Sequence, residues 1–180
     1  MKNITIKKYT TLASTAPYDL LLEHLQASNS FAGRSMEIRK MPYSNVKYCI
    51  RLASGIASWD NVQQLFAICF DVDERAFWNA RVTEYFPARK YLIKQLQAVV
   101  DGEAKQLSGT ATDGHLWDLA GAGRLSPFSD TLPLVQLGRQ LGQYPFDLGR
   151  KPYGEIMSLL VQVKVQNEVE TEYQKLMQKR

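Results

Sequence analysis

The 180-residue chain has few of the residues from which most catalytic and metal sites are built. It contains two histidines and two cysteines, and none of them shows the close spacing of a zinc site. It has no GxxxxGKS/T or GxGxxG phosphate-binding loop, and no GxSxG stretch that would mark a serine nucleophile. We therefore predict that the protein is not an enzyme and that it binds no cofactor or metal.

Long apolar runs are absent as well, so the sequence predicts no membrane partner. The first residues, MKNITIKKYTTL, include lysines but lack the apolar stretch of a secretory signal. Cys49 and Cys69 each lie in an apolar helical pattern, which is typical of buried free thiols in a reducing compartment. A disulfide between these two cysteines is the alternative.

The two histidines are the remaining candidates for acid–base chemistry. His115 lies between Asp113 and Asp118 in a glycine-rich segment, where such a group could act as an acid–base pair or a weak metal site. His24 falls in a leucine-rich stretch, which is typical of a histidine on a helix surface. An enzyme that uses His115 is therefore the least favoured of the functions considered.

An acidic cluster, Asp71, Asp73 and Glu74, raises the question of a calcium loop. Such a loop needs glycine at its sixth position and glutamate at its twelfth, and the sixth residue counted from Asp71 is Ala76. We interpret Asp73 and Glu74 instead as the first turn of a short helix, where the helix dipole favours negative charge.

The net charge of +4 is unevenly distributed along the chain. Residues 1–58 hold eight Lys and Arg against three Asp and Glu, whereas residues 59–180 hold fourteen against fifteen. A basic N-terminal third could contact nucleic acid or an acidic protein surface. The charges are scattered rather than clustered, however, so we favour solvated lysines and keep a DNA-binding module as an alternative.

The composition, 45% apolar and 22% charged, is that of an ordinary globular protein. We predict a mainly α fold, with a short N-terminal extended arm and a long C-terminal helix that starts at Pro152. Residues 1–12 form the arm, because residues 3–10 (NITIKKYT) alternate weakly and are rich in β-branched side chains. Residues 13–107 form a helical domain, 108–130 a glycine-rich loop, and 131–180 a C-terminal helical unit of the same domain.

Several helices can be placed within these regions. The clearest is WDNVQQLFAICF, with Asp60 as its N-cap and an apolar face at Val62, Leu65, Phe66, Cys69 and Phe70. The next segment predicts a short helix with Phe77 and Trp78 facing inward. A long helix then starts at Pro87, and its expected inward residues are Leu92, Leu96, Val99, Val100 and Leu107.

One short sequence pattern, Arg-Lys followed by Pro-Tyr, occurs twice, as RKMPYSNV (residues 39–46) and RKPYGEI (residues 150–156). Pro42 and Pro152 suit the first turn of a helix, because proline needs no amide partner there. Tyr43 and Tyr153 then begin two apolar stripes with matching offsets. An internal duplication and a coincidence between two ordinary helix starts both explain the pattern, and we interpret the four residues as structural anchors rather than as a ligand site.

Residues 137–160, LGRQLGQYPFDLGRKPYGEIMSLL, resemble a short stretch found in tail-assembly and related morphogenesis proteins of tailed bacteriophages. The matching features are Leu141-Gly142, the turn at Pro145, and the helix start at Pro152-Tyr153 followed by Glu155. The resemblance implies a non-enzymatic protein that binds other phage proteins during particle assembly or as part of the particle.

Together these observations predict a structural subunit of a phage virion, made in the host cytoplasm. It would form a homo-oligomer and contact other phage structural proteins, as a portal or tail ring or a connector does. The arm and the 108–130 loop would contact neighbouring subunits. A transient tail-assembly chaperone is the first alternative, and the DNA-binding module is the second.

Overall fold

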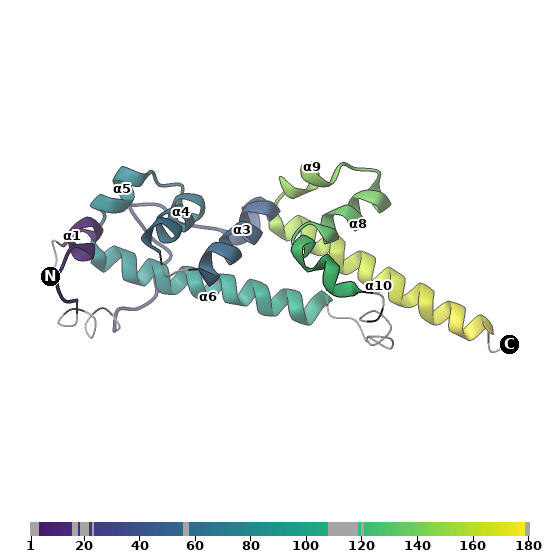
Figure 1. Cartoon of the computed structure of the whole chain (residues 1–180). Coiled ribbons are helices and arrows are strands. Elements are labelled where there is room, and N and C mark those ends of the chain that lie inside the picture. The colour runs from purple at the N-terminus through teal and green to yellow at the C-terminus, as the bar shows by residue number, and fades with distance from the viewer. Residues whose placement is uncertain are drawn as a thin grey trace. The chain divides into compact units, whose positions relative to one another are not determined.

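The computed structural model describes residues 4–15, 18, 22, 24–55, 58–107, 119 and 121–178 (Figure 1). In chain order its elements are α1 (Ile6–Thr10), η1 (Ile38–Lys40), α3 (Tyr43–Ser54), α4 (Trp59–Phe70), α5 (Glu74–Asn79), α6 (Val82–Leu107), η2 (Ala122–Phe128), α8 (Leu132–Leu141), α9 (Pro145–Gly149) and α10 (Tyr153–Gln178). They form two compact units. The first unit contains residues 1–38 and 48–100, and the second contains residues 39–47 and 101–180.

The predicted fold class is confirmed. The described residues are mainly helical and contain no strand, only isolated bridge pairs, and the chain ends in the long helix α10.

The predicted N-terminal extended arm is shorter than expected. Only Thr5 keeps an extended pairing, as a bridge to Arg81, and the next five residues form α1. The Thr5 side chain caps this helix by accepting the Lys8 N–H at 3.3 Å. Ile6 and Tyr9 are three positions apart and are both buried. A helical turn places both side chains on one face, whereas a strand would place them on opposite faces.

The first unit is built around an aromatic core. Phe31 contacts Phe66 edge-to-face, with 4.7 Å between the ring centroids, and Phe70, Phe77 and Tyr85 complete the cluster. The four phenylalanines are almost fully buried. Large aromatic side chains supply much of the burial energy in a core of this size, and their edge-to-face contacts add to it.

The α4 helix has the predicted buried face, but its N-cap differs from the prediction. Ser58 accepts the N–H of Asp60 at 3.2 Å, so Asp60 lies inside the first turn. The short helix α5 has Glu74 in its first turn as expected, whereas Asp73 is its N-cap and its carboxylate accepts the Ala76 N–H at 2.6 Å. These caps satisfy amides that the helices themselves leave unpaired.

The long helix α6 starts five residues before the predicted proline, at Val82. Pro87 lies inside the helix, where it removes one backbone hydrogen bond, and its carbonyl accepts the N–H of Ser28 at 3.1 Å. Leu96 and Val99 are buried as predicted, whereas Val100 is 39% exposed because it lies at the margin of the apolar face. Because proline is common at a helix start, the sequence predicted the start of α6 five residues too late.

In the second unit, α8 and α9 are joined by a tight turn. Gly142 ends α8 with φ +64°, the left-handed conformation that glycine adopts without strain. Gly138 is needed for a different reason, since an added Cβ would lie 2.6 Å from the Gln143 carbonyl oxygen. The apolar side chains that the second unit buries include Leu134 and Leu137 of α8.

Most of the predicted 108–130 loop lies outside the described residues. Its final part is described and contains η2, a short 3₁₀ helix that follows Gly121.

Candidate functional site

The two Pro-Tyr segments lie side by side in the second unit. Pro42 and Pro152 form an antiparallel bridge pair. The N–H of Tyr43 donates to the carbonyl of the residue before Pro152 at 2.9 Å, and the N–H of Tyr153 donates to the carbonyl of the residue before Pro42 at 2.8 Å. The pairing is therefore reciprocal. At each helix start, a backbone N–H that has no partner within its own helix donates to a carbonyl beside the other helix start.

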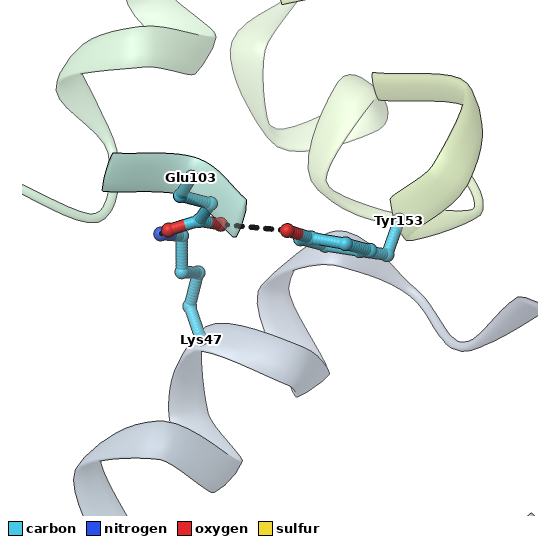
Figure 2. Close-up of polar contacts among 3 residues, drawn as sticks. All are labelled: Lys47, Glu103 and Tyr153. Atoms are coloured by element: carbon cyan, nitrogen blue, oxygen red, sulfur yellow. Dashed lines mark hydrogen bonds and ion pairs between the residues drawn. The ribbon is translucent and has the colours of Figure 1, made fainter. Parts of the chain in front are cut away.

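The side chains of the two tyrosines continue this pairing. Their rings stack with 5.9 Å between centroids and an interplanar angle of 15°, and both side chains are buried. The Tyr153 hydroxyl donates to the Glu103 carboxylate at 3.0 Å (Figure 2). The other oxygen of Glu103 accepts from the Lys47 ammonium at 2.5 Å, and both charged side chains are about 15% exposed. One carboxylate from the end of α6 thus joins the α3 and α10 helix starts.

The electrostatics of this cluster keep the two tyrosines neutral. Burial raises the pKa of Tyr43 and of Tyr153 well above the usual value, and the Glu103 carboxylate raises both further. A tyrosine whose pKa is raised can donate a hydrogen bond, but it does not supply a phenolate base or nucleophile near neutral pH. Lys47 also lies 5.5 Å from the Tyr43 ring centroid, within range of a cation–π contact.

The arrangement therefore suits a structural role, in which these contacts hold the starts of α3 and α10 and the end of α6 together. Lys47, Glu103 and the Tyr153 hydroxyl each have a partner within the cluster, and a half-buried ion pair that loses one partner leaves an uncompensated charge. Sequence reasoning identified Pro42, Tyr43, Pro152 and Tyr153, but not Glu103. No local pattern marks Glu103, since its partners are more than forty residues away along the chain.

The other candidates for chemistry do not form a site in the part of the chain that the structure describes. His24 is exposed, while His115, Asp113 and Asp118 lie outside the described residues. No group of three or more potential metal ligands occurs among the residues described. Cys49 and Cys69 are buried free thiols in the first unit, with 3.6 Å between their sulfur atoms.

Some of the basic residues in the N-terminal third are already paired. Arg34 forms an ion pair with Asp71 at 2.9 Å, and Lys47 is held by Glu103. Positive charges that are neutralised within the chain contribute less to an electrostatic footprint for nucleic acid.

The most unusual surface feature is the apolar surface of the second unit. Of the thirteen large apolar side chains that are exposed among the described residues, eleven belong to this unit. Five of them lie on the second half of α10 and form what we call the apolar stripe: Val165, Val169, Tyr173, Leu176 and Met177.

The stripe occupies one face of its helix. Its members recur at intervals of three or four residues, which places them on one side of an α-helix, and each is between 51% and 64% exposed. The opposite face of α10 lines a groove of about 700 Å³ with α8, at positions such as Leu160, Lys164 and Thr171. Every residue from 165 to 178 is exposed, so this half of the helix has little packing within the chain.

A second apolar patch lies at the turn between α8 and α9. The rings of Tyr144 and Phe146 contact each other with 5.4 Å between centroids, and both side chains are about 65% exposed. Leu141, at the end of α8, is also exposed. Exposed aromatic residues of this kind are enriched at protein interfaces.

Comparison with known proteins found no matching family model, no matching curated protein and no matching solved structure. None of the helices described is both long and apolar enough to cross a membrane.

Proposed function

We propose that the protein is a non-enzymatic assembly subunit that acts by binding other protein chains through its second unit. One observation carries this proposal: the second half of α10 is a helix with an apolar stripe that no other described residue covers. A helix of about this length is only marginally stable alone in water, and most helices are stabilised by packing of their apolar face. A partner that covers the stripe would supply that packing.

The finer form of the proposal is a structural subunit of a tailed-phage particle, such as a portal or tail ring or a connector component. It is supported by the sequence resemblance over residues 137–160, a region that spans the end of α8, α9 and the start of α10. The patch formed by Leu141, Tyr144 and Phe146 lies within it and is exposed. Location in the virion would follow from this role.

The test is the mass of the full chain in solution, alone and after coexpression with the products of the neighbouring genes. An assembly subunit is expected to elute above its monomer mass of 20.5 kDa in at least one of these samples. Lysine substitution at Tyr144 or at Tyr173, both on exposed patches, should reduce that mass. The matched control is Tyr48→Lys, at an exposed tyrosine of the first unit. A monomer in every sample would contradict the proposal.

A transient assembly chaperone is the second candidate, because an uncovered apolar helix also suits a protein that binds and then leaves. Mass spectrometry of purified particles separates the two roles. A structural subunit is expected in finished particles at a fixed ratio to the other components, whereas a chaperone is absent from them.

A further inference from the structure

We propose that Cys49 and Cys69 form a redox-sensitive cross-link, in which oxidation joins the two thiols as a disulfide that ties α3 to α4 within the first unit. In reducing surroundings they remain the free thiols described above. The proposal is independent of the assembly role, because it concerns the core of the first unit. It is carried by the positions of the two sulfur atoms and by the contacts that hold the two helices together.

The helices α3 and α4 bring the two sulfur atoms into direct contact. The Asn61 side chain donates to the Gly55 carbonyl at 2.8 Å, and the Tyr48 hydroxyl donates to the Gln64 side chain at 3.0 Å. One contact joins the helix ends beside the short connection and the other joins their middles, so α4 runs back alongside α3. The cysteines are 20 positions apart in the sequence, and their sulfur atoms lie 3.6 Å apart. A disulfide needs about 2 Å between the sulfurs, so the bond requires only a small approach of side chains that already touch.

The surroundings of the pair suit a disulfide as well as they suit two thiols. Cys49 is fully buried and Cys69 is 6% exposed, and buried apolar residues such as Leu52 and Leu65 lie on the same two helices. A disulfide has no hydrogen-bond donor, so its formation leaves no donor unpaired in this core. The chain has no other cysteine, so each thiol has a single possible partner within the chain.

The oxidant is a small-molecule disulfide, for which oxidised glutathione is the probe. Cys69 reacts first, because it is the less buried of the two cysteines. Its thiolate attacks one sulfur of the oxidant, the sulfur–sulfur bond of the oxidant breaks, and one glutathione thiolate leaves. Cys49 then gives up its proton and attacks the Cys69 sulfur, which releases the second glutathione. The protein has lost two electrons and two protons, and the two glutathione molecules have gained them.

The reaction is slow, so the cross-link is best characterised by its equilibrium constant. The hydrogen bond with Cys49 and burial raise the pKa of the Cys69 thiol well above its usual value, so the attacking thiolate is scarce near neutral pH. The equilibrium does not depend on that rate. A disulfide that stabilises the folded chain is itself favoured by folding, and by the same factor. The equilibrium constant for disulfide formation should therefore be larger in the folded chain than in the unfolded chain.

The experiment equilibrates the full chain with mixtures of reduced and oxidised glutathione, once folded and once unfolded in urea, and then stops the exchange with acid. Mass spectrometry counts the oxidised chains, which are lighter by two hydrogen atoms. The closed loop predicts an equilibrium constant about a hundredfold larger for the folded chain. In tryptic digests the bond joins residues 48–51 to residues 52–75, since trypsin cleaves after Lys47, Arg51 and Arg75.

A second measurement compares the stability of the oxidised and the reduced chain. The thermal unfolding midpoint of the oxidised protein should be about 5–10 °C higher, and a reducing agent should remove the difference. Cys69→Ala is the matched control, because it keeps Cys49 and a small apolar side chain but cannot form the bond. Its midpoint should be the same in oxidising and in reducing glutathione mixtures.

Three results would overturn the proposal. An equilibrium constant that is no larger in the folded chain than in urea would show that the folded arrangement opposes the bond. A disulfide between two chains would show that the touching thiols are not each other's preferred partners. A glutathione adduct that persists on Cys69 would show that Cys49 does not reach it. Each result leaves the assembly proposal intact, because both cysteines are buried in the first unit.

Discussion

The two units of this chain use their apolar side chains in opposite ways. The first unit buries a cluster of aromatic rings, and only Tyr48 and Val100 are large apolar residues left exposed among those described there. The second unit buries a smaller set around its two stacked tyrosines and leaves the stripe, the Tyr144–Phe146 patch and parts of η2 exposed.

This contrast separates stability from association. A buried apolar side chain stabilises the fold of its own chain, whereas an exposed one contributes only when another surface covers it. Exposed single residues are common in proteins, but a contiguous set on one helix face marks an interaction site more often than chance exposure does. We therefore expect substitutions in the first unit to act on folding, and substitutions on the second unit's surface to act on assembly.

The largest expected effect is that of Phe66→Ala in the first unit. Phe66 contacts Phe31, Phe70, Phe77 and Tyr85, so its loss leaves a cavity at the centre of the aromatic core. The free energy of unfolding should fall by about 3–5 kcal/mol, as is typical of a buried phenylalanine replaced by alanine. Urea denaturation measures this change, and a loss below about 1 kcal/mol would mean that this core is not the one that holds the unit together.

The pH dependence of stability compares the buried tyrosines of the two units. Burial raises the pKa of Tyr85 to about 12, against about 10 in the unfolded chain. From pH 10 to 12 the unfolded chain therefore releases a proton that the folded chain keeps, so stability is retained below pH 10 and falls as the pH rises. The loss from Tyr85 alone is about 3 kcal/mol at its limit.

Tyr43 and Tyr153 should act in the same direction in the second unit, because their pKa values are raised too. Urea denaturation at a series of pH values measures the combined effect. Tyr85→Phe should flatten the alkaline loss in part, and Tyr153→Phe should flatten another part. An unfolding free energy that stays constant from pH 9 to 12 would show that these hydroxyls are accessible to water in the folded state.

Much of the fold could be predicted from the sequence, because helical periodicity is a local property. The buried face of α4 and the long helix from Tyr153 both follow from apolar spacing and helix propensity. The errors arose where local signals compete. Pro87 suits a helix start, yet it lies inside α6, and the β-branched residues before Tyr9 suit a strand, yet Thr5 caps a helix there.

The candidate site was predictable only in part. The repeated Pro-Tyr pattern identified both tyrosines, but nothing local indicates that the two copies pair with each other across more than one hundred residues. Glu103 could not be identified for the same reason. The sequence predicted the long C-terminal helix but not its apolar stripe, because the exposure of Val169 and Tyr173 depends on which of the described residues pack against α10.

A middle-sized effect is expected from Glu103→Gln, which tests whether the polar cluster stabilises the second unit. The amide keeps the shape of the side chain but leaves the Lys47 ammonium, 16% exposed, without its counter-charge. The free energy of unfolding should fall by about 1–3 kcal/mol, the usual cost of a buried polar group that loses its partner. Thermal denaturation measures this change. Glu172→Gln, at an exposed ion pair on the same unit, is the control and should change it by less than about 1 kcal/mol.

The smallest effect on folding is expected from Tyr173→Ala, on the stripe. Its side chain is 63% exposed, so truncation removes little burial within the chain. At protein concentrations low enough to keep the chain monomeric, the unfolding free energy should change by no more than about 0.5 kcal/mol. At higher protein concentrations the unfolding free energy of the unmodified protein should rise with concentration, because association stabilises the folded state that associates. The unfolding free energy of the variant should not rise. Urea denaturation at two protein concentrations measures both quantities. If Tyr173→Ala were as costly as Phe66→Ala in the dilute sample, the stripe would belong to a core and the contrast between the two units would fail.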